Sequence, residues 1–124
     1  MSYNFNQKID RDFLTSMYDD DYLYIAEIFQ TTSDQLVTDV DLLKQYFSGG
    51  DALNLKRQVH KIKPAFGFVG LTETEAACQQ FENKCLSVTS TGALQSDYEQ
   101  LVGLLEESMV IITTEIEKLK EYNS

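Results

Sequence analysis

The stretch that decides the fold is residues 51–71, which read DALNLKRQVHKIKPAFGFVGL. Its apolar side chains recur at steps of four and three residues, the spacing of one buried face of a helix in a bundle. Asp51 is a suitable N-cap, because its carboxylate can accept the free amides of the first turn, and Gly70 is a suitable end. We therefore expect one bundle helix here, whose buried face consists of Leu55, Val59, Ile62, Phe66 and Val69.

The sequence before this stretch repeats the helical spacing twice. A short helix is expected from the N-cap Asp10 to about residue 18, with Phe13, Leu14 and Met17 facing inward. The acidic run 19–21 is typical of a helix N-terminus, because carboxylates are stabilised by the positive end of the helix dipole. A long helix is therefore expected to follow and to end at the glycines at 49 and 50.

Two capping-box patterns, Thr72–Glu75 and Ser96–Glu99, predict the starts of two more helices, with Ala93 as an alternative start for the last one. Residues 87–92 are expected to form the loop between them. Short connections make neighbouring helices antiparallel. The sequence thus predicts an all-α fold, an antiparallel up-down-up-down four-helix bundle with a short additional N-terminal helix. We expect one domain over residues 1–124, in which residues 1–8 form a loose N-terminal arm.

The chain is acidic, because ten basic and twenty acidic side chains give it a net charge of −10. Nucleic acids and anionic membranes attract positive surfaces, so neither is an expected partner. The sequence has no basic start followed by an apolar run, as a signal peptide would, and no apolar run of about 18 residues that would span a bilayer. We expect a cytoplasmic protein.

The two cysteines, Cys78 and Cys85, are seven residues apart. On a helix this spacing is about 10 Å along the axis, which is too long for a disulfide. We expect both to be small core residues in a reducing compartment. Two thiols and one distant histidine make a poor zinc site, so no metal is expected.

The only histidine, His60, lies in a basic segment of this acidic chain. Helical spacing places it at the edge of the buried face. A neutral imidazole with one free nitrogen is a competent nucleophile, and neighbouring cations stabilise an anion such as a phosphoryl group. Its position alone also fits a solvated or half-buried histidine without a chemical role. Residues 52–72 contain no acidic side chain but hold four of the ten basic ones, Lys56, Arg57, Lys61 and Lys63.

Pro64, the only proline, falls inside the helix that carries His60. Proline removes one helical hydrogen bond and clashes with the carbonyl four residues earlier, which is that of His60. We expect a local kink, which either presents the imidazole or simply bends the helix around the core. Gly67 is expected to leave a dent through which another protein's surface can approach. Phe68 beside it is either part of that surface or part of the core.

The segment around His60 resembles the signature of the histidine-containing phosphotransfer (HPt) domain family of multistep two-component signalling. That signature has a histidine, a lysine three residues on, a small residue at four, usually glycine, and a glycine at ten followed by an apolar residue. Proline replaces the usual glycine in this chain. The replacement affects the local backbone geometry, and with it the transfer rate or the range of partners. The family often carries a cysteine and a glutamate one turn apart on the next helix. The matching residues are His60, Ile62, Lys63, Pro64, Gly70, Leu71, Cys78 and Glu82.

The resemblance implies that His60 accepts a phosphoryl group from an aspartate of one receiver domain and passes it to another receiver domain. Lys63 would neutralise the phosphoryl group. Glu82 would hold the imidazole proton, although one turn of register error would give this position to Gln79 or Cys78. The magnesium ion would belong to the receiver, so the chain itself would need no cofactor. It would be a phosphohistidine carrier rather than a kinase or other enzyme, since no nucleotide-binding loop is present.

The expected partners are receiver domains of response regulators and of hybrid histidine kinases. An acidic receiver pocket would complement the mixed apolar and basic face around the histidine. The alternative is a helical-bundle adaptor or dimerisation module without phosphotransfer. A bundle enzyme or metal carrier is a poorer match, because the chain has no paired Glu-x-x-His motif. The residues expected to bind the partner are Lys56, Arg57, Pro64, Gly67 and Phe68.

Overall fold

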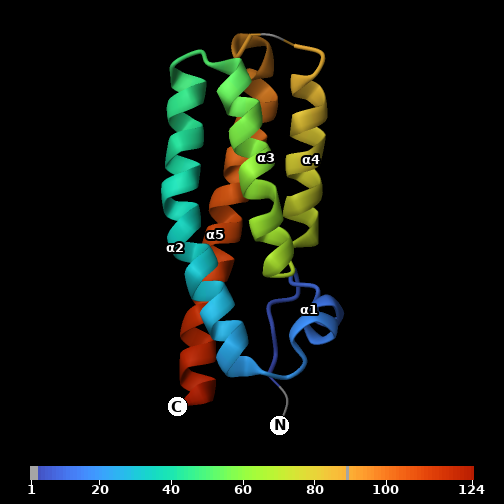
Figure 1. Cartoon of the computed structure of the whole chain (residues 1–124), viewed down its shortest axis with the longest axis vertical. Coiled ribbons are helices and arrows are strands. Elements are labelled where there is room, and N and C mark those ends of the chain that lie inside the picture. Colours follow the sequence, from blue (N-terminus) through green and yellow to red (C-terminus); the bar gives the residue numbers. More distant parts are fainter. Residues whose placement is uncertain (1–2, 89) are drawn as a thin grey trace.

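The computed structural model describes residues 3–88 and 90–124, and its regular elements there are all helices. Four long helices stand side by side and form a bundle, and the short α1 lies at one end of it (Figure 1). The predicted all-α bundle with an extra N-terminal helix is therefore confirmed. The elements are α1 (Arg11–Tyr18), α2 (Tyr22–Ser48), α3 (Ala52–Phe68), α4 (Thr72–Cys85), η1 (Gly92–Leu94) and α5 (Gln95–Asn123).

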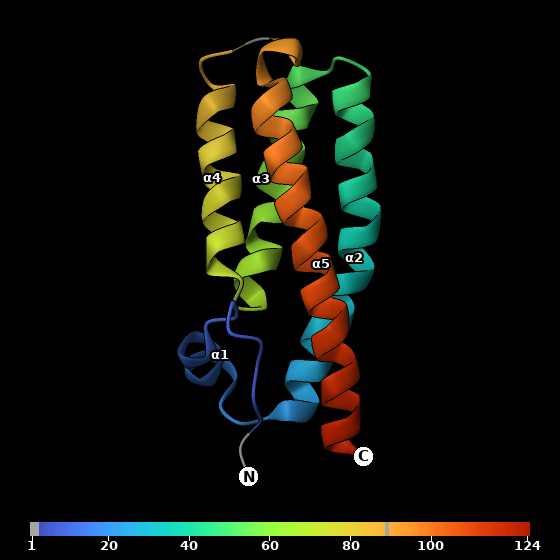
Figure 2. The same cartoon turned by 180° about the vertical axis from the view of Figure 1, so that it is seen from behind.

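Each long helix packs against its two neighbours around the bundle, in the order α2, α3, α4, α5 and back to α2. Successive helices run in opposite directions, as Figures 1 and 2 show from two sides. The apolar face predicted for α3 is confirmed, because its five residues are at most 1 % exposed. The largest fully buried side chains of the core are Phe29, Phe66, Leu14, Ile25, Leu36, Leu43, Leu55, Ile62, Leu94, Leu105, Ile112 and Leu119.

The first three helices are capped by aspartates: Asp10 and Asp51 were predicted as caps, and Asp21 belongs to the acidic run predicted at a helix N-terminus. The side chains of Asp10, Asp21 and Asp51 each accept a hydrogen bond from the backbone N–H three residues later, at 3.0–3.1 Å. The two capping boxes are wrong: α4 begins after Leu71 and α5 after Leu94, and neither helix has a side-chain cap. Both N-caps are buried leucines, so packing into the core sets these two starts.

Residues 3–9 do not form the loose arm that the sequence suggests. Tyr3 is only 4 % exposed, and its hydroxyl donates to Oε1 of the buried Glu115 at 3.1 Å. The backbone N–H of Asn6 donates to the same oxygen, and Lys118 Nζ donates to the carbonyl of Asn4. These contacts tie the segment to α5. The first two residues of the expected arm lie outside the described residues, as does residue 89 of the expected loop.

The inward face predicted for α1 is correct only in part. Leu14 is fully buried and Phe13 is half-buried, but Met17 is 57 % exposed. The physical reason is that α1 lies across the end of the bundle instead of joining it, so only a narrow face of α1 meets the core (Figure 1). Met17 is left on the surface beside α3.

Both cysteines are free thiols. The predicted core position is found for Cys78, whereas Cys85 is only partly buried. Cys78 is fully buried, and this burial raises the pKa of its thiol to about 12. Cys85 is half-buried, and burial again raises the pKa of its thiol. Neither thiol is therefore an activated nucleophile at neutral pH.

Candidate functional site

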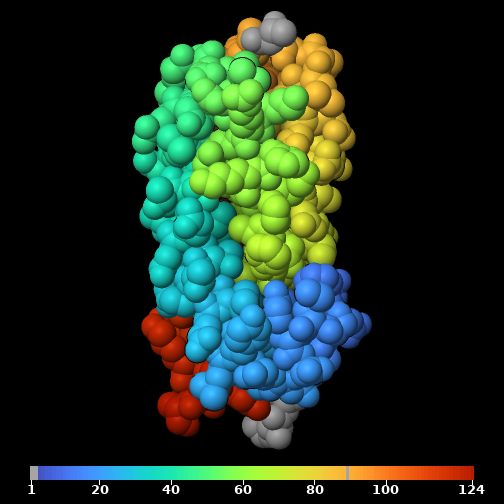
Figure 3. Space-filling view, viewed as in Figure 1, coloured from blue at the N-terminus to red at the C-terminus, as the bar shows by residue number. Residues whose placement is uncertain are grey.

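The exposed face of α3 forms a ridge along one side of the bundle (Figure 3). Successive positions on a helix are about 100° apart. At this spacing, the exposed residues of α3 all fall within one arc of about 100° around the helix axis. His60 lies at one border of this arc, next to α4, and its side chain is 70 % exposed. Its imidazole is therefore open to a partner. The ridge consists of Leu53, Arg57, His60, Lys61, Pro64 and Phe68.

Glu82 on α4 holds one nitrogen of the imidazole. His60 Nδ1 lies 3.0 Å from Oε2 of Glu82. Burial alone would raise the pKa of the Glu82 carboxyl, but hydrogen bonds and charge from Lys63 and His60 outweigh it and lower the pKa below its ordinary value. The carboxylate is thus ionised at neutral pH and can accept a hydrogen bond from Nδ1. In the tautomer that carries its proton on Nδ1, the nitrogen free to react is Nε2.

Lys63 is also held against α4. Its Nζ lies 2.9 Å from Oε1 of Glu82 and donates to Oε1 of Gln79 at 2.6 Å. Gln79 in turn donates to Asn83 at 3.0 Å. The Lys63 side chain is only 18 % exposed, so its ammonium is paired with the Glu82 carboxylate and does not extend into solvent. Of the three register alternatives for the imidazole's partner, the geometry selects Glu82, and Gln79 contacts the lysine.

Lys61, on the other border of the ridge, is paired with α2. Its Nζ is 3.3 Å from Oδ1 of Asp39, a carboxylate that is only 5 % exposed and also accepts from Gln35. No ion pair joins Lys56 or Arg57 to an acidic side chain among residues 3–88 and 90–124. These two residues, one turn before His60, therefore carry the uncompensated positive charge of the basic segment.

Pro64 lies on the exposed ridge, and α3 continues as one helix through it (Figure 1). The proline has no N–H to donate, so the His60 carbonyl lacks the usual helical hydrogen bond. The helix tolerates this loss because the position faces solvent, where water can satisfy a carbonyl.

Gly67 does not leave the dent that the sequence suggests. A Cβ atom at this position would lie 2.5 Å from Oε2 of Glu75, so the carboxylate of α4 occupies the space beside the glycine. The glycine therefore makes room for the end of the Glu75 side chain. Phe68, in contrast, is 53 % exposed and therefore belongs to the surface and not to the core.

Sequence reasoning missed the acidic residues that face the ridge from both sides. Asp39 approaches from α2 and Glu75 from α4. A signal for Glu75 was present, because Glu75, Gln79 and Glu82 recur at steps of four and three and so share one helix face. For Asp39 the sequence offers no comparable pattern, because its side chain lies among the buried residues of a long helix.

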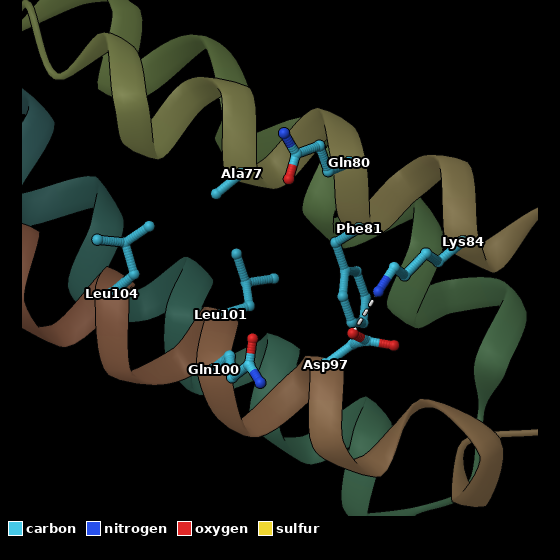
Figure 4. A pocket seen from close by; sticks show the side chains of 8 residues that line it. All are labelled: Ala77, Gln80, Phe81, Lys84, Asp97, Gln100, Leu101 and Leu104. Carbon is cyan, nitrogen blue, oxygen red and sulfur yellow. Dashed lines mark hydrogen bonds and ion pairs between the residues drawn. The ribbon is translucent and has the colours of Figure 1, made fainter.

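A hollow of about 280 Å³ lies between α4 and α5, and the Lys84–Asp97 ion pair closes one end of it (Figure 4). Its lining offers amides and apolar side chains but neither a histidine nor a thiol, so it supplies no nucleophile. The lining residues are Ala77, Gln80, Phe81, Lys84, Asp97, Gln100, Leu101 and Leu104. This hollow therefore supplies neither an imidazole nor a thiol.

Residues 25–121 match the family model described as the Hpt domain. The chain belongs to the Hpt domain family. Hpt domains are phosphocarrier modules of phosphorelays and are not enzymes. Among curated proteins and among solved structures, no match to the chain was found. The Hpt match begins inside α2, so α1 and the first residues of α2 lie outside it.

Two further observations concern the described part of this Hpt domain. Within residues 3–88 and 90–124, no group of three or more His, Cys, Asp or Glu side chains is arranged to hold a metal ion. None of the helices described is both long enough and apolar enough to cross a membrane.

Proposed function

We propose that His60 is the phosphoacceptor of a phosphorelay. The observation that carries this proposal is a 70 % exposed imidazole whose Nδ1 lies 3.0 Å from an ionised carboxylate, which leaves Nε2 as the nitrogen available for attack. Nε2 attacks the phosphorus of an aspartyl phosphate on a receiver domain. The N–P bond forms, the P–O bond to the aspartate breaks, and the aspartate leaves as a carboxylate. In the next step, a carboxylate of a second receiver takes the phosphoryl group and Nε2 is regenerated.

Glu82 and Lys63 act on this reaction from α4 and α3. Glu82 keeps the proton on Nδ1 and stabilises the positive charge that spreads over the ring as the N–P bond forms. Lys63 lies one turn from the imidazole and neutralises the phosphoryl oxygens once its ammonium turns from Glu82 toward them. The magnesium ion is expected on the receiver, and this chain is expected to need no cofactor of its own.

The exposed ridge of α3 is the proposed docking surface for receiver domains of response regulators and hybrid histidine kinases. Lys56 and Arg57 supply unpaired positive charge for an acidic receiver pocket, and Pro64 and Phe68 supply apolar contact. Gly67 contributes indirectly, since it brings Glu75 to the border of this surface. A cytoplasmic location agrees with the two free thiols and stays a prediction.

The test is transfer of radiolabelled phosphate from a phosphorylated receiver domain to the purified chain. The bond formed should be acid-labile and base-stable, as a phosphoramidate is. His60→Gln should abolish labelling while leaving the helical circular dichroism unchanged, because the side chain is exposed. Labelling that survives this substitution would refute the assignment. An adaptor or dimerisation module without phosphotransfer would bind receivers and remain unlabelled.

A further inference from the structure

The contacts between α3 and α4 around the imidazole follow one register. The two helices lie side by side and run in opposite directions (Figures 1 and 2). Each step of three or four residues toward the end of α3 is matched by an equal step toward the start of α4, so the partners face each other at the same level along the bundle. The pairs are His60 with Glu82, Lys63 with Gln79, and Gly67 with Glu75.

Lys63 contacts two acceptors that draw its ammonium in different directions along the helix. Gln79 lies at the level of Lys63 itself, whereas Glu82 lies at the level of His60. Nζ donates to Oε1 of Gln79 at 2.6 Å and lies 2.9 Å from Oε1 of Glu82. Within residues 3–88 and 90–124, this oxygen of Glu82 is buried and accepts no well-aligned hydrogen bond. The aligned hydrogen bond of the ammonium is therefore directed at Gln79, away from His60.

Asn83 fixes the orientation of the Gln79 amide. An ammonium group only donates hydrogen bonds, so the amide has to present its oxygen to Lys63. Its Nε2 then points the other way and donates to Oδ1 of Asn83, four residues later, at 3.0 Å. Both amides are on the exposed side of α4, so these two hydrogen bonds, rather than burial, hold Gln79 against the lysine.

A phosphoryl group on His60 would need the ammonium in another place. The level of His60 is about 4.5 Å along the helix axis from that of Gln79. Because Nδ1 is the nitrogen that contacts Glu82, a phosphoryl group on Nε2 would also lie beyond the ring, farther from α4. Lys63 would thus give up its bond to Gln79 to reach the phosphoryl oxygens. An interaction made in only one of two states shifts the equilibrium toward that state.

We propose that Gln79 is a positioning residue that holds the Lys63 ammonium away from His60 in the unphosphorylated chain and so shifts the phosphotransfer equilibrium toward the receiver. This inference rests on the proposed phosphotransfer at His60. As Nε2 forms the N–P bond and the P–O bond to the receiver aspartate breaks, Lys63 exchanges the amide oxygen of Gln79 for a phosphoryl oxygen. When the phosphoryl group passes to the next receiver, the exchange is reversed.

The experiment measures the equilibrium of transfer between the full chain and a receiver domain that labels the wild type. The receiver carries radiolabelled phosphate, and the label on both proteins at the plateau gives the equilibrium constant for phosphorylation of His60. Gln79→Met keeps the length of the side chain, but its sulfur is a weak acceptor. We expect the equilibrium constant to rise about fivefold, which corresponds to the net contribution of one hydrogen bond. Gln79→Glu should lower it, because a carboxylate attracts the ammonium more strongly and repels the phosphoryl group.

The equilibrium constant separates positioning from docking. A residue that only contacts the docked receiver changes the forward and reverse rates together, and the equilibrium between the separated proteins stays the same. Gln80→Met makes the same substitution at the next exposed position of α4 and should leave the equilibrium constant unchanged. In a Lys63→Met background, Gln79→Met should have no further effect, because Gln79 acts through Lys63. Circular dichroism should be the same for all variants.

Three outcomes, each with the wild type labelled on His60, would overturn this inference alone. An equilibrium constant for Gln79→Met within about 1.5-fold of the wild type would remove Gln79 from the reaction. A fall would show that Gln79 holds Lys63 in its productive position. A fivefold rise that persists in the Lys63→Met background would show that Gln79 acts independently of Lys63. If no receiver labels the wild type, or if the label is not on His60, the proposed function is refuted and this inference with it.

Discussion

Replacing Glu82 by glutamine tests the arrangement on which the proposed phosphotransfer depends. The substitution keeps the shape of the side chain but removes the negative charge beside the imidazole and beside Lys63. An amide can present its oxygen to only one of these two donors at a time. We therefore expect Glu82→Gln to slow phosphoryl transfer to His60 and to leave receiver binding nearly unchanged.

The magnitude follows from the distance and from the exposure of the ring. Nδ1 and Oε2 are 3.0 Å apart. Two unit charges about 4 Å apart attract by about 4 kcal/mol at an effective dielectric constant of about 20. Only part of a charge develops on the ring in the transition state, and the His60 side chain is 70 % exposed, so solvent screens the interaction. About one third of the full value remains, or about 1.4 kcal/mol, which is about tenfold in rate.

The assay is rapid-quench measurement of a single turnover from a radiolabelled receiver at saturating concentration. Glu117→Gln, which removes an exposed carboxylate on α5, is the matched control and should transfer at the wild-type rate. If Glu82→Gln transfers within about twofold of the wild type while its circular dichroism is unchanged, the carboxylate does not assist the imidazole and the reasoning fails.

Three further predictions concern the same border between α3 and α4. Lys63→Ala should slow transfer about tenfold, because the phosphoryl oxygens lose a neutralising cation. It should lower the free energy of unfolding, measured by urea titration, by about 1 kcal/mol. A larger effect on folding than on transfer would contradict this prediction. Gly67→Ala should raise the free energy of unfolding by up to about 1 kcal/mol, because alanine favours the helix and the end of the Glu75 side chain can rotate away. A lower free energy of unfolding in urea titrations would show that the Glu75 carboxylate is fixed in place. The pKa of Glu82 is lowered by folding, so its stabilisation is complete above the ordinary carboxyl pKa of 4.5 and disappears as pH falls through the lower folded value. The stability difference between wild type and Glu82→Gln should thus be constant near pH 7 and shrink below about pH 4.5, and a pH-independent difference would contradict the assignment.

The bundle could be predicted because its information is local and periodic. Steps of three and four apolar residues identify a helix face wherever that face meets a continuous core, as in α3. Aspartate caps are equally local: the two expected at Asp10 and Asp51 form, and the acidic run 19–21 supplies a third at Asp21. The capping boxes at Thr72–Glu75 and Ser96–Glu99 failed because the N-caps are the buried Leu71 and Leu94, one and two positions earlier. This packing into the core outweighs a hydrogen bond at the surface.

From helical spacing alone, the candidate site was predictable only as far as one helix extends, and Glu82 on the next helix was expected only from the family resemblance. His60, Lys63 and their spacing are local, but the carboxylates that pair with basic residues come from other helices. Asp39 approaches Lys61 from α2, and Glu75 fills the space beside Gly67 from α4. Their positions depend on helix rotation and on the distance between axes, which a single sequence specifies only loosely. For the same reason, the sequence does not predict that residues 3–8 of the expected arm dock, since their hydrogen-bond acceptor is Glu115 on α5.

The pairing of charges around His60 has a consequence for the phosphorylated state. A phosphoryl group adds about two negative charges beside a cation that is already bound to Glu82. If Lys63 simply left, it would strand a carboxylate whose side chain is only 11 % exposed, and an unpaired buried charge is costly. The phosphorylated ring removes this cost, because its Nδ1–H carries positive charge and stays hydrogen-bonded to Glu82. Phosphorylation would therefore strengthen the interaction of Glu82 with the imidazole and weaken its interaction with Lys63. Lys63 would then be free to bind the phosphoryl oxygens. If His60 is the phosphoacceptor that we propose, no buried charge is left unpaired in either state, and we expect transfer in both directions, as a carrier between two receivers requires.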